Sequence, residues 1–117
     1  DSTIGLDFAL ARMTNVIDKL IIYPENMQSN LDKLGGLIHS QRVLLELTQK
    51  GMTREESYAA VQRNAMPVWL EGKDFRNLLK ADSAIEKYLS HSEIDDLFEM
   101  SFHMKHIDTI FSRVFGE

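Results

Sequence analysis

The sequence predicts an all-α fold, with a long leading helix at residues 1–23 followed by a compact bundle of short helices. Three observations support this prediction. Apolar residues recur at intervals of three and four along most of the chain, which is the spacing of one helix face. Helix-capping motifs precede several of these stretches. No stretch shows the alternation of apolar and polar residues that would indicate a pair of strands.

Length and composition bound the class of protein. The 117 residues correspond to about one domain. Lys and Arg number 13 and Asp and Glu number 18, so the net charge of −5 argues against a surface that neutralises nucleic-acid phosphates. Cysteine is absent, which excludes disulfides, thiolate metal sites and a cysteine nucleophile. Without a transmembrane or signal-peptide pattern, we expect a cytoplasmic protein that contacts neither membrane nor nucleic acid.

The leading helix is apolar on nearly every side. Its apolar residues are Leu6, Leu10, Met13, Ile17 and Leu20 in one seam and Ile4, Phe8, Ala9, Ala11, Val16, Ile21 and Ile22 around it. Such a helix is normally buried on several sides, so we expect partner helices from other subunits or from further sequence. The alternative is the central core helix of a small bundle. Because the pattern begins at once after Asp1, which is not a start methionine, we interpret the chain as a piece of a longer protein.

Proline and glycine divide the middle of the chain. Pro24 ends or bends the leading helix, because proline lacks an amide donor and disfavours helical geometry at the residue before it. It can also be the first residue of a short helix that runs to Leu34, after which Gly35-Gly36 breaks the chain. Apolar spacing predicts the next helix over residues 37–50, with Gly51 in the left-handed conformation that ends it.

A second amphipathic helix is predicted to begin at Thr53, which stands at capping-box spacing from Glu56. Pro67 removes an amide donor inside this helix, so we expect a kink there, and Gly72 ends the helix. Trp69 is expected to be a buried anchor. Four methionines are expected to fill gaps in the core, namely Met27, Met52, Met66 and Met104.

Three short helices are predicted to follow in succession, beginning at Asp74, Ser83 and Ser90. The second and third each carry a glutamate three residues after their first serine, so each should begin with a capping box. A final amphipathic helix is predicted over residues 102–115, where apolar residues again follow helical spacing.

The histidines are the candidates for acid–base or metal chemistry, because their ordinary pKa is near neutrality. They are His39, His91, His103 and His106. The last two stand on neighbouring turns of a helix, but a metal site needs a third ligand and Lys105 would repel a cation. We therefore favour surface or capping roles for them over metal ligation.

Four hydrogen-bonding residues, His39-Ser40-Gln41-Arg42, begin an otherwise apolar helix. A cation near a helix N-terminus opposes the helix dipole, and such a cost can mark a site. We favour a structural interpretation, in which Gln41 and Arg42 hydrogen-bond to neighbouring helices or subunits. Ser40 and His39 do not define a nucleophile and its base, because adjacent helical residues point about 100° apart.

A helix-turn-helix is a second interpretation, since two helices are joined by a turn around Gly51. Glu55 and Glu56 in the first turn of the second helix oppose contact with DNA phosphates, and Arg54 and Arg63 do not compensate. The sequence contains no glycine-rich phosphate loop, paired-carboxylate pattern or nucleotide fingerprint. Residue chemistry alone therefore indicates a helical module without a self-contained active site.

Several segments resemble bacterial adenylosuccinate lyases in their order and spacing. They are Asp1-Ser2-Thr3-Ile4, Tyr23-Pro24-Glu25-Asn26-Met27, Gly36-Leu37-Ile38-His39-Ser40-Gln41-Arg42-Val43-Leu44-Leu45, Gly51-Met52-Thr53-Arg54-Glu55-Glu56, Val61-Gln62-Arg63-Asn64-Ala65-Met66, Trp69, Phe75-Arg76 and Val114-Phe115-Gly116. The resemblance covers essentially the whole chain, and Pro67 departs from it. It implies the end of a long central-bundle helix at residues 1–23 and an all-helical C-terminal domain at residues 24–117, in a homotetramer of the fumarase/aspartase superfamily.

The resemblance also implies a chemistry. Members of this family release fumarate by β-elimination from adenylosuccinate, giving AMP, and from the succinyl carboxamide ribotide of purine synthesis, without a metal or organic cofactor. The family's Ser-Ser-x-Met-Pro-x-Lys-x-Asn loop and its acid histidine do not occur in this sequence. No catalytic, substrate-binding or metal-binding residue is therefore assigned, and the chain alone is expected to be inactive. The alternatives are a stand-alone interaction or DNA-binding module, and a related lyase for another succinyl substrate.

Overall fold

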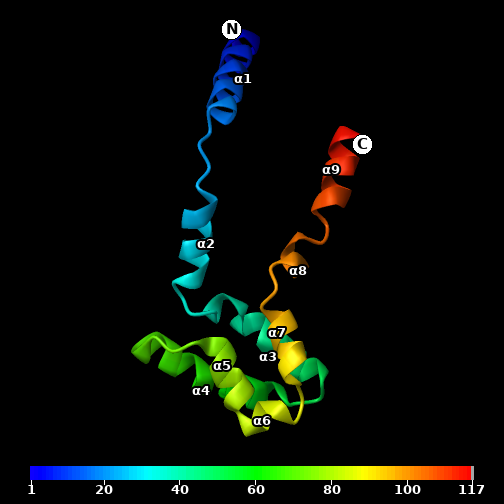
Figure 1. Cartoon of the computed structure of the whole chain (residues 1–117). Helices are drawn as coiled ribbons and strands as arrows, with labels where there is room; N and C mark the ends of the chain where they lie inside the picture. Colours follow the sequence, from blue (N-terminus) through cyan, green and yellow to red (C-terminus); the bar gives the residue numbers. More distant parts are fainter. Residues whose placement is uncertain (117) are drawn as a thin grey trace.

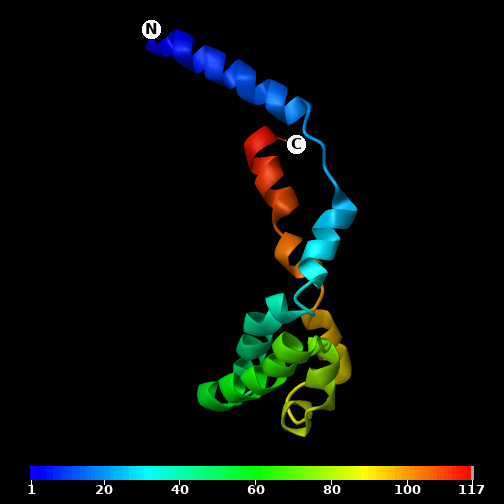
Figure 2. The same ribbon diagram turned by 90° about the vertical axis from the view of Figure 1, so that its left-hand side faces the viewer.

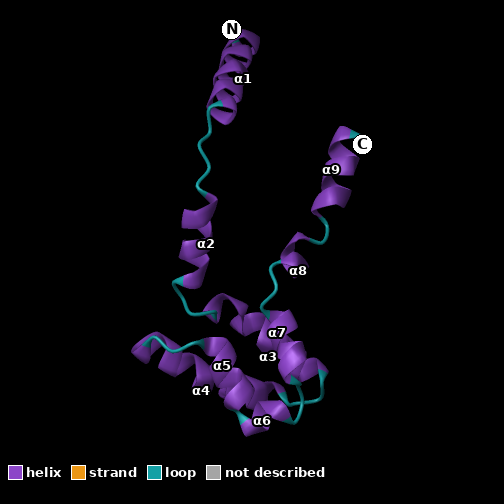
Figure 3. Ribbon diagram, in the orientation of Figure 1, coloured by secondary structure: helices purple, strands orange, loops and turns teal. Residues whose placement is uncertain are grey.

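The computed structural model describes residues 1–116, and over that range it consists of helices and loops without strands (Figure 3). The predicted all-α fold is confirmed. In chain order the described elements are α1 (Ser2–Asp18), α2 (Pro24–Asp32), the 3-10 helix η1 (Leu37–His39), α3 (Ser40–Gln49), α4 (Arg54–Glu71), α5 (Phe75–Ala81), α6 (Ser83–Glu86), α7 (His91–Leu97), α8 (Ser101–Met104) and α9 (Ile107–Phe115).

Two helical arms project from a helical body (Figures 1 and 2). The body contains η1 and α3 to α7, and the arms are α1–α2 at one end of the chain and α8–α9 at the other. The radius of gyration is 20.6 Å, whereas a compact chain of this length has a value of about 13 Å. No residue of α1, α2, α8 or α9 is buried. The arms therefore account for the elongated shape.

The hydrophobic core lies entirely within the body. Helix α3 packs against α4, and α5 packs against α4, α6 and α7. The buried apolar residues are Val43, Leu47, Met52, Ala60, Val61, Val68, Phe75, Leu79, Ile85, Leu89, Ile94, Leu97 and Phe98. Each large side chain among them contributes about 1.5–3 kcal/mol through its removal from water. This core fixes the positions of the loops that carry the candidate site.

The turn between α3 and α4 forms as predicted. Gly51 adopts a left-handed φ of +101°. The Thr53 hydroxyl accepts a hydrogen bond from the Glu56 amide, and the Glu56 carboxylate accepts one from the Thr53 amide, each at 3.3 Å. Helix α4 then passes through Pro67 without interruption and ends at Gly72, whose φ is +68°.

The short helices are capped by side chains, although one predicted cap is wrong. Asp74 caps α5, and Ser90 with Glu93 forms the expected capping box of α7. Ser83 does not cap α6. It is the first residue inside that helix, and the carboxylate of Asp82 accepts the hydrogen bond from the Ala84 amide at 2.9 Å. The capping residue is Asp82 because contacts from α4 hold its carboxylate in place, as described below.

Both arms contain shorter helices than predicted. The leading helix ends at Asp18 rather than Tyr23, and the β-branched Ile21 and Ile22, together with Tyr23 directly before Pro24, disfavour further helix. The final helix is divided into α8 and α9. Side chains of α8 contact the body, whereas α9 contains no buried residue.

The exposure of several large residues differs from the prediction. Trp69 is 69% exposed and is not a buried anchor. It follows the buried Val68 on α4, and successive helical residues point about 100° apart, so Trp69 lies off the face that packs. Met52 is buried as expected, but three methionines predicted to fill the core are exposed, namely Met27, Met66 and Met104. Among the described residues, no helix is long and apolar enough to cross a membrane.

Candidate functional site

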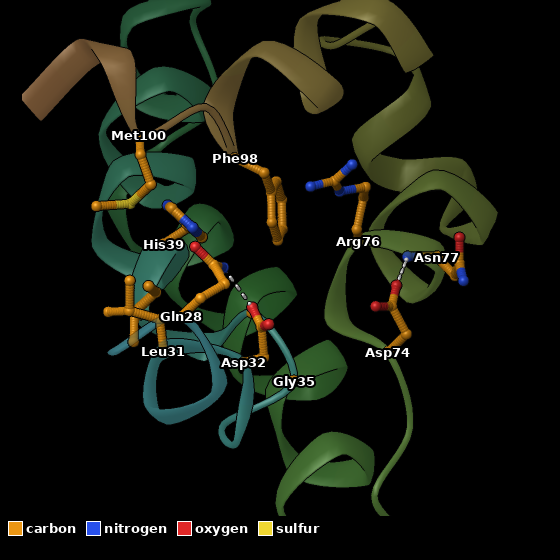
Figure 4. A pocket seen from close by; sticks show the side chains of 12 residues that line it. Gln28, Leu31, Asp32, Gly35, His39, Asp74, Arg76, Asn77, Phe98 and Met100 are labelled. Carbon is orange, nitrogen blue, oxygen red and sulfur yellow. Dashed lines mark hydrogen bonds between the residues drawn. The ribbon is translucent and has the colours of Figure 1, made fainter. Parts of the chain in front are cut away.

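A hollow with a volume of about 480 Å³ lies where α2 meets the body (Figure 4). Its walls come from α2, the Gly35-Gly36 turn, η1, α5 and the end of α7. The polar and charged side chains that line it are Gln28, Asp32, His39, Asp74, Arg76 and Asn77. The hollow includes the first residue of the His39–Arg42 segment that the sequence singled out.

The Gly35-Gly36 turn positions the elements around this hollow. Both glycines have positive φ, +54° and +88°. The carbonyl of Gly35 accepts a hydrogen bond from the Phe75 amide at 3.0 Å, which joins the turn to the start of α5. A Cβ on Gly36 would lie 2.7 Å from Cε1 of Phe98. Glycine is therefore required here both by backbone geometry and by the close approach of an aromatic ring.

His39 is the buried titratable group of the site. Only 6% of its surface is exposed, and its Nδ1 is buried without a hydrogen-bond partner among the described residues. Its ring centroid lies 4.9 Å from that of Phe98, and the Arg76 guanidinium lies 4.8 Å from the Phe98 centroid on the side away from His39 (Figure 4). Burial lowers the pKa of His39, and His103, Arg42 and Arg76 lower it further. The imidazole is therefore neutral at neutral pH.

Arg42 has the structural role that the sequence favoured. Its Nη1 donates hydrogen bonds to the carbonyls of Leu97 at 2.9 Å and Glu99 at 3.3 Å. Its guanidinium also lies 4.0 Å from the ring centroid of Phe102. One side chain of α3 thus holds both the end of α7 and the start of α8. Within residues 1–116, Ser40 and His39 form no hydrogen bond that would couple a nucleophile to a base.

The other histidines lie in three different surroundings. Nε2 of His91 is 3.2 Å from the Lys80 carbonyl. The His103 ring lies 6.4 Å from that of His39, and His106 is the residue before α9. The described part of the chain contains no group of three histidine or acidic residues arranged around one point. The structure therefore brings together His39 and His103, which are distant in the sequence, rather than His103 and His106.

A polar network that the sequence did not predict joins α4 to the start of α6. Nη2 of Arg63 lies 2.6 Å from Oδ2 of Asp82, and Nδ2 of Asn64 donates to the same oxygen at 2.7 Å. Burial raises the pKa of Asp82, but hydrogen bonds from Arg63, Asn64 and the Ala84 amide outweigh it and lower the pKa overall. The adjacent polar residues Arg63 and Asn64 could have indicated this network in the sequence. Their common partner, Asp82, is however 18 or more residues further along the chain. The network is structural, because its groups satisfy one another.

The geometry of α4 does not provide a DNA-binding surface for the helix-turn-helix interpretation. Glu55 and Glu56 are exposed in the first turn of α4, where a recognition helix would approach DNA. Glu56 is also engaged in the capping box, and Arg63 is paired with Asp82. The surface of α4 therefore offers acidic groups where DNA binding needs cations.

Comparisons with known proteins provide the remaining finding. A family described as "Adenylosuccinate lyase C-terminus" matches residues 36–114. The adenylosuccinate lyase of Helicobacter pylori (strain J99) is 47% identical to this chain over an alignment 126 residues long. The alignment covers 99% of this chain. The same alignment includes 29% of the Helicobacter protein, so the chain spans less than a third of the length of this relative.

Proposed function

Because the chain belongs to the adenylosuccinate lyase family, we propose that it forms the C-terminal part of an enzyme that releases fumarate from adenylosuccinate. The observation that carries this proposal is identity of 47% that extends over 99% of the chain. The reaction is a β-elimination, in which a base removes the proton beside a carboxylate and an acid protonates the leaving nitrogen. The second proposed substrate is the succinyl carboxamide ribotide, which places the enzyme in purine synthesis in the cytoplasm.

The proposed role of this chain in the enzyme is structural. No residue among the 117 is assigned to catalysis, substrate binding or a metal, and no cofactor is required by the proposed elimination. The division into residues 1–23, as the end of a central-bundle helix, and residues 24–117, as a helical domain, belongs to this proposal. The proposal also includes a homotetrameric assembly and the absence of nucleic-acid and membrane partners.

The exposure of α1 supports the assembly. Leu10, Met13 and Ile17 lie on one seam of α1, and each is about 60% exposed. Most of the stability of a helix in a protein comes from packing against other elements rather than from helix propensity. A helix that exposes apolar side chains all round is stabilised when other helices cover it. A bundle formed with the rest of the enzyme and with other subunits would supply that cover.

A chimaeric enzyme tests the proposal directly. The segment of the Helicobacter pylori lyase that aligns with this chain is replaced by residues 1–117, and fumarate release from both substrates is measured. We expect activity within about tenfold of the parent enzyme, since each tenfold loss corresponds to only about 1.4 kcal/mol. A folded chimaera of the same oligomeric state that releases no fumarate from either substrate would refute the proposal.

Matched variants show whether α1 acts through its apolar seam. Met13→Glu in the chimaera places a charge in the seam and should abolish assembly and activity together. Asn15→Glu changes the charge equally at an exposed polar position two residues away and should leave both nearly unchanged. The isolated chain should release no fumarate.

A further inference from the structure

We propose that His39 and His103 form a pH-sensitive latch, which holds α8, the base of the C-terminal arm, against the body in neutral solution and releases it in mildly acidic solution. The two rings lie 6.4 Å apart and belong to segments more than 60 residues apart in the chain. The inference does not depend on the proposed lyase function. It concerns how the C-terminal arm is attached to the body.

Two adjacent residues of α8, Phe102 and His103, make aromatic contacts with the body. Phe102 lies under the Arg42 guanidinium, at 4.0 Å, and Lys105 lies 4.3 Å from the same ring. The Phe102 ring also contacts the His103 ring edge to face, at 5.4 Å. No residue of α8 or α9 is buried. The contacts of Phe102 with Arg42 and of His103 with His39 join α8 to the body, so a change in charge at either pair bears directly on docking.

The surroundings of His39 make its protonation unfavourable while α8 is docked. The imidazole is buried against Phe98, and its Nδ1 has no acceptor among the described residues to which a proton could be donated. Two cationic side chains of the packed segments oppose its protonation, namely Arg42 of α3 and Arg76 of α5.

Two carboxylates face the hollow beside His39, and each is already engaged. Asp32 of α2 accepts a hydrogen bond from Gln28 at 3.0 Å. Asp74 before α5 accepts one from the Asn77 amide at 2.8 Å. Neither carboxylate is bonded to His39. The charged neighbours that act on the imidazole, Arg42 and Arg76, therefore both oppose its protonation, as does the neighbouring His103.

The direction of the pH effect follows from these contacts. The docked state lowers the pKa of His39 from its ordinary value of 6.5, chiefly by burial. Undocking removes His103 and opens the ring to water, which raises the pKa toward that value, so the undocked state binds more protons. Docking is therefore strongest above pH about 6.5 and weakens as the pH falls below it. Each unit by which undocking raises the pKa changes the docking equilibrium tenfold.

Spin labels can measure the docking of α8 directly. The chain contains no cysteine, so Gln62→Cys on α4 and Met104→Cys on α8 place two labels specifically. The distance distribution is measured at pH 7.5 and at pH 5.5. We expect a narrow distribution at pH 7.5 that broadens at pH 5.5. An unchanged distribution, whether narrow or broad, would overturn the proposal.

Histidine variants show which side chains cause the broadening at pH 5.5. His39→Phe retains an aromatic ring without a titratable group and should remain docked at both pH values. His103→Gln, at an exposed position, should at least halve the broadening and tests the proposal even if His39→Phe does not fold. His91→Gln on α7 is the matched control and should broaden like the unsubstituted chain. Broadening that persists in both His39→Phe and His103→Gln would overturn the proposal.

Discussion

The Arg63 guanidinium lies 2.6 Å from the carboxylate of Asp82, and this ion pair joins the middle of α4 to the N-terminus of α6. The carboxylate is 10% exposed, whereas the arginine side chain is 57% exposed. Asp82 thus brings a buried charge into the core, where Asn64 and the Ala84 amide also bind it. This one side chain therefore links α4 to the start of α6.

Asp82→Ala should lower the free energy of unfolding by about 2–4 kcal/mol. The substitution removes the cap of α6 and leaves Asn64 and Arg63 without their common acceptor. Urea unfolding followed by circular dichroism measures the change. Asp96→Ala removes an exposed carboxylate of α7 and should change the free energy by no more than about 0.5 kcal/mol. Equal effects of the two substitutions would show that the network of Asp82 contributes nothing to the free energy of unfolding.

Gly36→Ala should destabilise the body by about 2–4 kcal/mol. The new Cβ meets Phe98 at 2.7 Å, and the backbone φ of +88° is unfavourable for alanine. Gly51→Ala is the control, because Gly51 also has positive φ but has nothing within 4 Å of a Cβ. The difference between the two variants in thermal unfolding therefore reports the contact with Phe98. A difference near zero would mean that the ring moves aside without cost.

Glu93 should account for part of the stability that the body loses in acid. Hydrogen bonds from Lys50, then from the Ser90 amide and hydroxyl, lower the pKa of Glu93 to about 2. Its contribution is therefore complete above its ordinary pKa of 4.5 and is lost as the pH falls toward 2. In urea unfolding between pH 6 and pH 2.5, Glu93→Gln should show a smaller loss of stability than the unsubstituted chain. Glu99→Gln, at an exposed position, should follow the unsubstituted chain, and the same slope for Glu93→Gln would contradict the assignment.

The seam of α1 should cause the isolated chain to associate. Leu10 and Ile17 are exposed in the single chain, and association would remove them from water. Sedimentation across a hundredfold range of concentration should show a rising average mass. Leu10→Lys with Ile17→Lys should return the chain to a monomer, whereas Asn15→Lys, on the opposite side of α1, should not. A monomer at every concentration would contradict the prediction.

Local signals predicted the helices of the body well. The capping boxes at Thr53 and Ser90 involve residues three positions apart, so their geometry is encoded in short segments. Asp82 and Ser83 are both good capping residues. The choice between them depends on Arg63 and Asn64, which approach from α4. Sequence spacing does not contain that tertiary contact.

The candidate site was only partly predictable, because it also depends on contacts between segments that are distant in the sequence. The role of Arg42 followed from its unfavourable place near a helix start, which implied a compensating partner. The approach of His103 to His39 depends on how the chain returns after α7. Trp69 was mispredicted because composition does not show which face of α4 packs on the core.

The native protein that contains this chain provides the most direct test of the central claim. An antibody against residues 37–99 can capture it from the cells that make it, and the captured protein can be weighed and assayed with adenylosuccinate. We predict a polypeptide more than three times the 13.4 kDa of this chain, because the chain aligns with 29% of its Helicobacter relative. We also predict that it releases fumarate. A captured polypeptide of 13.4 kDa without that activity would contradict the account.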